Sequence, residues 1–139
     1  MSRNPVKDFS IDPADVKYVG EGLQRPECIL AERDGSLWSA DARGGVVHIK
    51  PDGSQSVVTQ QTSGNFEGAS NEEERYVSGT LPNGLAFASN GDFLISNFGT
   101  DRLERMKRTG ESEVIFDTID GSAIGKVNFV LRDSKDRLW

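Results

Sequence analysis

Several features that would define a protein class are scarce or missing in this sequence. Its 139 residues contain one cysteine, Cys28, so no disulfide can form within the chain. Residues 1–15 are polar, with no apolar run that could act as a signal peptide. No stretch approaches the roughly 18 apolar residues needed to span a bilayer. We therefore expect a cytoplasmic protein without a membrane partner.

Clustered positive charge is also missing. The 16 Lys and Arg residues are scattered among 22 Asp and Glu residues, and the formal net charge is −6. A surface that binds nucleic acid concentrates basic residues, so we expect no nucleic-acid partner. With 35% hydrophobic and 27% charged residues the composition is typical of a globular chain, and the length allows one ordinary domain.

The most informative feature that is present is an internal repeat. Residues 26–41 align without gaps with residues 82–97, and a third copy begins at residue 127. Each copy has short apolar runs separated by hairpin-type turns, such as Asp34-Gly35 and Asn90-Gly91. Repeats of about 40–50 residues with several short strands are typical of propeller blades. The sequence therefore predicts an all-β fold, an arc of about two and a half blades of a β-propeller.

The repeat also sets the domain organisation that we expect. An N-terminal arm covers residues 1–19, and residues 20–139 form the propeller arc. The blade repeats are 26–58, 82–117 and the start of a third at 127–139, with an inter-blade loop at 59–81. An unpaired edge after the third repeat predicts that the chain self-associates or needs a further C-terminal part for activity.

One polar position recurs in all three copies. Glu27, Asn83 and Asn128 each stand directly before the first strand of their repeat. In a propeller this strand is the innermost one, so equivalent side chains converge on the central axis. Carboxylate and amide oxygens suit a hard divalent cation, calcium or magnesium, and zinc is a further candidate. The alternative is that each side chain caps a local turn, for which Pro-Asn-Gly at Asn83 is a common setting.

These motifs, taken together in their order and spacing, resemble one family. They are Pro26-Glu27-Cys28, Asp34-Gly35-Ser36-Leu37-Trp38, Pro82-Asn83-Gly84-Leu85-Ala86, and Asn128 followed by Leu138-Trp139. The chain resembles the gluconolactonase, senescence-marker-protein and luciferin-regenerating-enzyme family. That resemblance implies a six-bladed propeller with one divalent metal ion on its axis, bound by Glu27. It also implies that an Asn and an Asp beyond Trp139 complete the metal site.

The resemblance implies hydrolysis of a lactone or related cyclic ester. The cation acts as a Lewis acid on the carbonyl, and an axial Asp, expected beyond Trp139, serves as the general base. Asn128 matches a residue that contacts substrate in the family, and Lys126 and Asn83 are the other candidates for substrate binding. The family commonly has Arg in place of Lys126 and Asp in place of Phe129, and these departures weaken the prediction of a sugar lactone.

Other sites are weaker candidates. The single histidine, His48, lies between Val47 and Ile49 in a predicted strand, where a surface or packing role is expected. Cys28 is expected to be a small buried hydrophobe. A second hypothesis for the function is a non-catalytic propeller that binds a ligand or serves as a scaffold. Trp38 and Leu94 occupy equivalent positions in the repeat and are expected to fill the space between blades.

Overall fold

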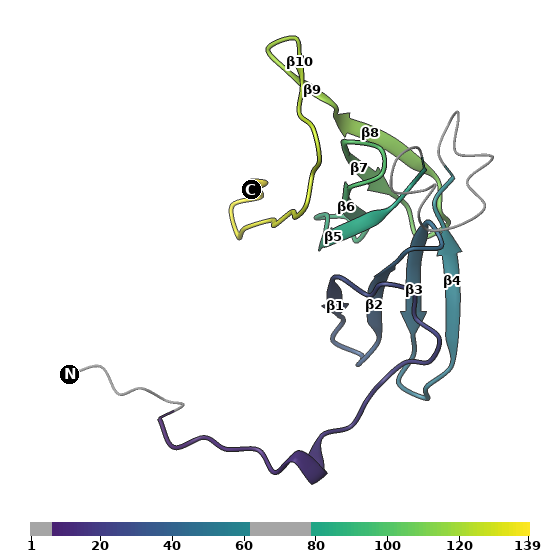
Figure 1. Cartoon of the computed structure of the whole chain (residues 1–139), viewed down its shortest axis with the longest axis vertical. Coiled ribbons are helices and arrows are strands. Elements are labelled where there is room, and N and C mark those ends of the chain that lie inside the picture. The colour runs from purple at the N-terminus through teal and green to yellow at the C-terminus, as the bar shows by residue number, and fades with distance from the viewer. Residues whose placement is uncertain (1–6, 62–78) are drawn as a thin grey trace.

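Two antiparallel four-stranded sheets make up most of the structure, a computed structural model that describes residues 7–61 and 79–139 (Figure 1). The first sheet has the order β1-β2-β3-β4, and the second has the order β5-β6-β7-β8. The first four strands are β1 (Ile29–Ala31), β2 (Leu37–Asp41), β3 (Gly45–Ile49) and β4 (Gln55–Thr59). The next four are β5 (Pro82–Phe87), β6 (Phe93–Asn97), β7 (Arg102–Met106) and β8 (Ser112–Phe116). Short elements outside the sheets are the 3-10 turn η1 (Pro13–Asp15) and the hairpin of β9 (Thr118–Ile119) and β10 (Ser122–Ala123).

Each sheet is a meander in which consecutive strands pair, so the two predicted blades are confirmed. The hairpin turns occur where the sequence places them. Gly35 and Gly91 have φ values of 91° and 87°, which glycine adopts without steric cost. Beside Gly35, the side chain of Asp34 accepts a hydrogen bond from the backbone N–H of Ser36 at 2.9 Å. Local turn chemistry therefore fixes the register of each meander.

The third repeat begins a further hairpin beside β5. Leu131 and Trp139 exchange backbone hydrogen bonds of 3.0 and 2.9 Å, and Arg132 bridges to Leu138. The N-terminal segment extends away from the sheets, as Figure 1 shows in purple. The described part of the chain is thus an arc of two complete blades and the start of a third. No helix within it is long and apolar enough to cross a membrane.

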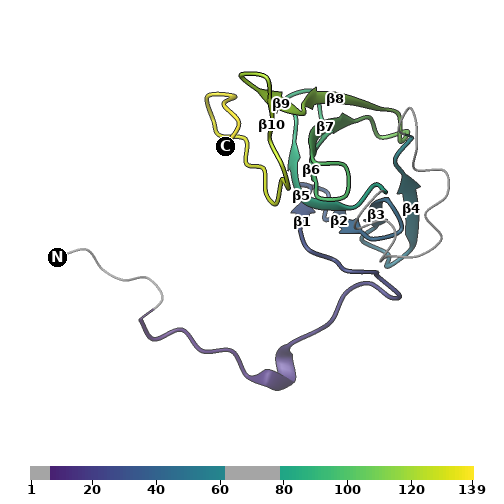
Figure 2. The ribbon, with the colours of Figure 1, turned by 45° about the horizontal axis from the view of Figure 1, so that its top comes forward.

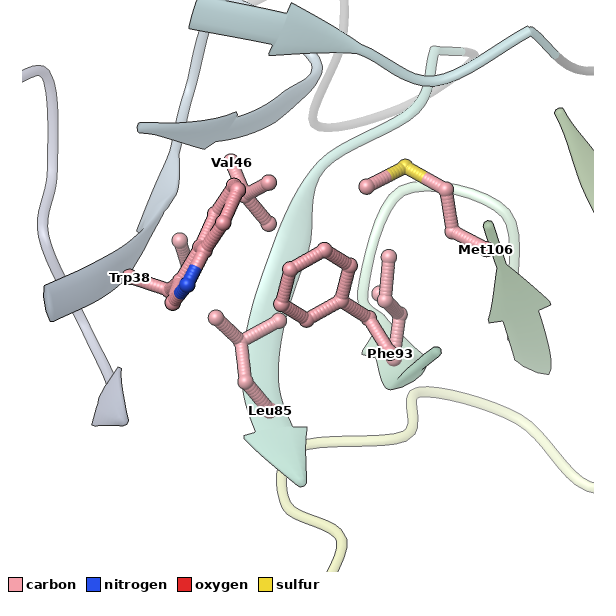
Figure 3. Close-up of a cluster of buried hydrophobic side chains, with 7 residues drawn as sticks. Trp38, Val46, Leu85, Phe93 and Met106 are labelled. Atoms are coloured by element: carbon pink, nitrogen blue, oxygen red, sulfur yellow. The ribbon is translucent and has the colours of Figure 1, made fainter. Parts of the chain in front are cut away.

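The main core lies between the first two blades (Figure 3). Its buried members are Trp38, Ala40 and Val46 from the first blade and Leu85, Phe93, Ile95 and Met106 from the second. A smaller cluster of Ala86, Leu94 and Val130 joins the second blade to the third repeat. Trp38 and Leu94 therefore occupy equivalent positions in successive inter-blade cores, as the repeat predicts.

A polar group holds the two blades together at the end of the main core. The guanidinium of Arg108, from the β7–β8 turn, pairs with the Glu32 carboxylate at 3.0 Å and lies 4.7 Å from the centroid of the Trp38 ring. The indole Nε1 of Trp38 donates to Glu32 at 2.7 Å, and the ring stacks on His48 with centroids 3.9 Å apart. His48 therefore has the packing role expected of it, and Cys28 is half-buried against the same core.

We expect the stability of this contact to depend on pH. The hydrogen bond from Trp38, followed by the interactions with Arg108, holds the pKa of Glu32 below its ordinary value of 4.5. A carboxyl whose pKa is lowered by folding stabilises the folded state above its ordinary pKa, and this contribution is lost as the pH falls through the folded pKa. The melting temperature of the wild type should therefore exceed that of Glu32→Gln at pH 7, and the gap should close below pH 4.5. A gap that stays constant down to pH 3 would contradict this assignment.

Most of the predicted inter-blade loop falls on residues 62–78, which lie outside the described residues. Its first predicted residue, Thr59, belongs to β4. Gln60 and Thr80 also fall within the predicted loop, but they are buried, and Gln60 contacts both blades through Gly44 and Glu104.

Candidate axial site

The starts of the inner strands and the ends of their neighbours lie at one edge of the blades, which we call the mouth. The pairing of Pro82 with Asn97 places the start of β5 beside the end of β6. In the first blade, the backbone N–H of Ala40 donates to the carbonyl of Cys28 at 3.1 Å, so β1 also begins at this edge. The turns that follow β2 and β6 therefore share the mouth with the three predicted site residues.

The first segments of the three repeats lie side by side (Figure 2). The Cys28 thiol contacts the carbonyl oxygen of Leu85 at 3.6 Å. A Cβ atom added to Gly84 would lie 2.7 Å from the Cα of Phe129 and 3.0 Å from the backbone nitrogen of Val130. Only glycine permits this approach, because real Cβ atoms essentially never come within 3.0 Å of such a neighbour. Gly84 thus brings the third repeat against β5, directly beside Asn83.

Asn83 and Asn128 are in direct contact. The Nδ2 of Asn83 donates to the backbone carbonyl of Asn128 and to its side-chain Oδ1, both at 2.7 Å. The β5–β6 register shifts between Pro82 and Gly84, so Asn83 is the extra residue of a bulge. Bulges redirect side chains, and this one sends Asn83 across to the next repeat. The structure therefore brings together two of the three residues that the repeat alignment singled out.

One atom of this pair has no hydrogen-bond partner among the described residues. Asn83 is 5% exposed, and its Oδ1 is buried without a hydrogen bond from the described residues. Exchanging the positions of Oδ1 and Nδ2 by rotating the Asn83 amide would not give a better arrangement. Nδ2 would lose both hydrogen bonds to Asn128, and Oδ1 would face two acceptor oxygens. These contacts thus fix which atom of the amide is Oδ1, an acceptor that receives no hydrogen bond within residues 7–61 and 79–139. Such an atom costs free energy unless water, a cation or a ligand donor reaches it.

Glu27 lies at the equivalent point of the first blade. Its side chain is 41% exposed, and Oε1 forms an ion pair with Nε of Arg25 at 2.9 Å. Within residues 7–61 and 79–139, no group of three or more His, Cys, Asp or Glu side chains could hold a metal ion. Any cation at the mouth would consequently depend on amide oxygens, on water or on residues outside the described ranges as well as on Glu27.

Lys126 is held at the rim of the mouth by the β6–β7 turn. Its Nζ lies 2.9 Å from Oδ1 of Asp101 and donates to the carbonyl of Phe98 at 2.9 Å. The ammonium also lies 5.3 Å from the centroid of the Phe98 ring. Lys126 is thus close in sequence to Asn128, but in this structure its ammonium group is already paired with Asp101 and the carbonyl of Phe98.

Two buried polar residues that support the mouth were not predicted as site residues. Asp41 accepts hydrogen bonds from Nε of Arg43 at 2.7 Å and from the backbone N–H of Gln24 at 2.9 Å. Burial disfavours its charge, but these hydrogen bonds outweigh burial and keep the pKa of Asp41 below its ordinary value. At the equivalent position in the second blade, Oδ1 of Asn97 accepts from the backbone N–H of Leu81 at 2.8 Å. Asp41 and Asn97 are the last residues of the gapless alignment between the first two repeats. This equivalence is the sequence signal from which they could have been identified.

The second unpredicted group surrounds Glu104, which is 1% exposed. Its Oε2 accepts from Gln60 and from Nδ2 of Asn97, the latter at 2.9 Å, and Oε1 accepts from Thr100 at 3.1 Å. Thr80 completes the group through a 2.7 Å hydrogen bond to Gln60. These contacts join Gln60, the residue after β4, to β6 and β7 and hold the backbone that leads into Asn83.

Comparisons with known proteins support the fold. No protein-family model matches the chain, and no curated protein matches it at a significant level. One similar solved structure is a catalytically inactive virginiamycin B lyase from Staphylococcus aureus with quinupristin, at 16% identity and a TM-score of 0.59 over 87% of this chain. Another is a provisionally assigned gluconolactonase, at 24% identity and a TM-score of 0.56, again over 87% of this chain. The chain spans 36% and 43% of the lengths of these two proteins. Together with the two blades described above, these similarities show that the chain has a β-propeller fold.

Proposed function

We propose that these blades contribute to a metal-dependent hydrolase of lactones or related cyclic esters, whose reaction takes place at the mouth. The observation that carries this proposal is the unpartnered Oδ1 of Asn83, a buried acceptor at the start of an inner strand. Its contact with Asn128 and the similar position of Glu27 support a shared axial site. The structural similarity to the provisionally assigned gluconolactonase is consistent with it.

The available donors fit a hard divalent cation. Glu27 offers a carboxylate and Asn83 an amide oxygen, the ligand types that calcium and magnesium prefer in proteins. Glu27 remains accessible at 41% exposure, so its carboxylate can exchange Arg25 for a cation. We propose that Glu27 is the principal ligand in this part of the protein and that water or other residues complete the coordination.

The roles of the remaining residues follow from their contacts. A bound cation would supply Lewis-acid polarisation of the lactone carbonyl. The side chain of Asn128 is exposed at the mouth, where it can orient the ring of the substrate through a hydrogen bond. Lys126 lies at the rim and contributes positive potential that favours the negative charge developing on the carbonyl oxygen.

The test is the substitution Glu27→Gln, which removes the ligand charge and retains the shape of the side chain. We expect its affinity for Ca²⁺, measured by calorimetry, to fall at least about tenfold, because the loss of even an outer-shell partner of a metal ligand typically costs that much. Lactone hydrolysis should fall with it, while the melting temperature without metal should stay within a few degrees of the wild type. Glu21→Gln, on the exposed N-terminal segment, is the matched control and should leave both the Ca²⁺ affinity and the rate of lactone hydrolysis unchanged.

Unchanged Ca²⁺ affinity in Glu27→Gln would remove this residue from the metal site. Turnover of lactones that survives complete removal of divalent cations by a chelator would contradict a metal-dependent reaction.

A non-catalytic ligand-binding propeller is the second candidate. It is favoured by the engagement of Lys126 with Asp101 and Phe98, which keeps the ammonium away from a substrate. This alternative predicts cation-dependent binding of a small molecule without its conversion. Product analysis after incubation with a panel of lactones distinguishes the two functions.

A further inference from the structure

The guanidinium of Arg108 is enclosed at the junction of the first two blades. Its central carbon lies 4.7, 5.1 and 4.6 Å from the centroids of three aromatic rings, those of Trp38, Phe87 and Phe93. Nη2 and Nη1 donate to the two carboxylate oxygens of Glu32 at 3.0 and 3.3 Å. Nε donates to the carbonyl of Gly91 at 2.7 Å. We call these three rings, the Glu32 carboxylate and the Gly91 carbonyl the cage.

The walls of the cage are held in place by contacts that do not involve Arg108. Trp38 and Phe93 lie side by side with centroids 4.8 Å apart (Figure 3), and Phe93 lies 5.9 Å from Phe87. The Glu32 carboxylate accepts from the Trp38 indole at 2.7 Å, and the backbone N–H of Glu32 closes the β1–β2 turn through a 2.8 Å hydrogen bond. Removal of the Arg108 side chain should therefore leave a preformed cavity with an anionic end.

The cage is particular to the first junction. In the gapless alignment of the repeats, Ala88 stands at the position of Glu32 and Leu94 at the position of Trp38. The junction between the second blade and the third repeat packs around Leu94 all the same. A blade junction can thus form without a counterpart of either the carboxylate or the indole.

The cage opens to solvent at the edge of the blades opposite to the mouth. Glu32 follows the end of β1, Gly91 lies in the β5–β6 turn and Arg108 lies in the β7–β8 turn. The side chains of Arg108 and Glu32 are 34% and 32% exposed, so a small cation can reach the carboxylate. The cage is consequently separate from the candidate axial site and from the proposed lactone chemistry.

We propose that the cage is a guanidinium-binding site, which Arg108 occupies as a tethered ligand and which an external alkylguanidinium occupies when Arg108 is displaced or removed. A guanidinium is planar, stacks on aromatic rings and presents parallel N–H groups to both oxygens of a carboxylate. An alkylammonium is a compact point charge that cannot match this fork. An anion would face only acceptors, the Glu32 carboxylate and the Gly91 carbonyl.

The test removes the tethered ligand and supplies it in free form. Arg108→Ala lacks the atoms that make up ethylguanidinium, so this ion is the probe, at millimolar concentrations far below those that denature proteins. In ¹⁵N–¹H spectra the indole N–H of Trp38, distinguished from the second indole by Trp139→Phe, should shift and saturate. The melting temperature of Arg108→Ala should rise over the same range, because a ligand that binds only the folded state stabilises it. Wild type should need at least about tenfold more probe, because the probe must compete with a group held in the same chain.

Matched probes and variants separate charge from shape. Ethylurea is planar but neutral, and ethylammonium is charged but not planar, so neither should give a saturable shift of the Trp38 indole at the same concentrations. In the Arg108→Ala background, Glu32→Gln removes the charge of the cage and should abolish the response to ethylguanidinium. Glu113→Gln, at a carboxylate that is 60% exposed and outside the cage, should leave the response unchanged.

The absence of a saturable response in folded Arg108→Ala, or an equal response in the variant that also carries Glu32→Gln, overturns the proposal. An equal response to ethylurea does the same, because it would show a cavity that selects shape alone. A wild-type response at the concentrations that saturate Arg108→Ala would place the probe elsewhere on the protein. If Arg108→Ala is unfolded, ethylguanidinium but not ethylurea should restore its dispersed spectrum, and failure to do so also overturns the site. None of these results depends on lactone hydrolysis.

Discussion

Replacing Trp38 with alanine should lower the free energy of unfolding by about 3–5 kcal/mol, the usual cost of truncating a large buried aromatic residue. Trp38 is 5% exposed, and its ring stacks on His48 and lies 4.8 Å, centroid to centroid, from Phe93 of the next blade. Its indole also donates to Glu32, which loses this partner in the variant. Urea unfolding followed by fluorescence or circular dichroism measures the difference.

The matched control is Tyr18→Ala, because Tyr18 is an aromatic residue that is 96% exposed. Its substitution should change the free energy of unfolding by less than about 0.5 kcal/mol. An equally small effect at Trp38 would mean that the two blades do not pack as described.

Glu104→Leu should destabilise the protein by about 1–3 kcal/mol, because the buried amide of Gln60 loses its acceptor. Asn97 also loses one acceptor, but its Nδ2 keeps the hydrogen bond to Thr80 at 2.7 Å. The leucine fills similar space, so a void contributes little. Glu104→Gln keeps one acceptor oxygen and should cost less. Unfolding in urea compares the three proteins, and a leucine variant as stable as the wild type would show that the polar group is dispensable.

Much of the fold could be predicted because its determinants are local. Asp34-Gly35 and Asn90-Gly91 specify hairpin turns whatever surrounds them, and the alternation of apolar residues between them specifies strands. The equivalence of Trp38 and Leu94 required only the repeat. The inter-blade contact of Arg108 with Glu32 could not be predicted, because it joins residues 76 positions apart through a side chain that the repeat does not share.

Part of the candidate site could be predicted from the repeat as well. Repeat alignment identified Asn83 and Asn128, and the structure joins them. It did not predict the direction of their hydrogen bonds, which depends on the bulge at Asn83 and on the absence of a side chain at Gly84. Glu104 was missed because a single acidic residue in a strand resembles a solvent-exposed one until the register places it on the same face as Met106.

The most direct test of the axial site is a crystal structure of the protein soaked in Ca²⁺ or Mn²⁺, with anomalous difference maps to locate the ions. We expect one strong peak at the mouth, within about 2.3–2.6 Å of Oδ1 of Asn83 for Ca²⁺. The Glu27 carboxylate should have turned from Arg25 towards the same ion. A strong peak elsewhere on the blades, with Oδ1 of Asn83 accepting a hydrogen bond from a protein group, would contradict it.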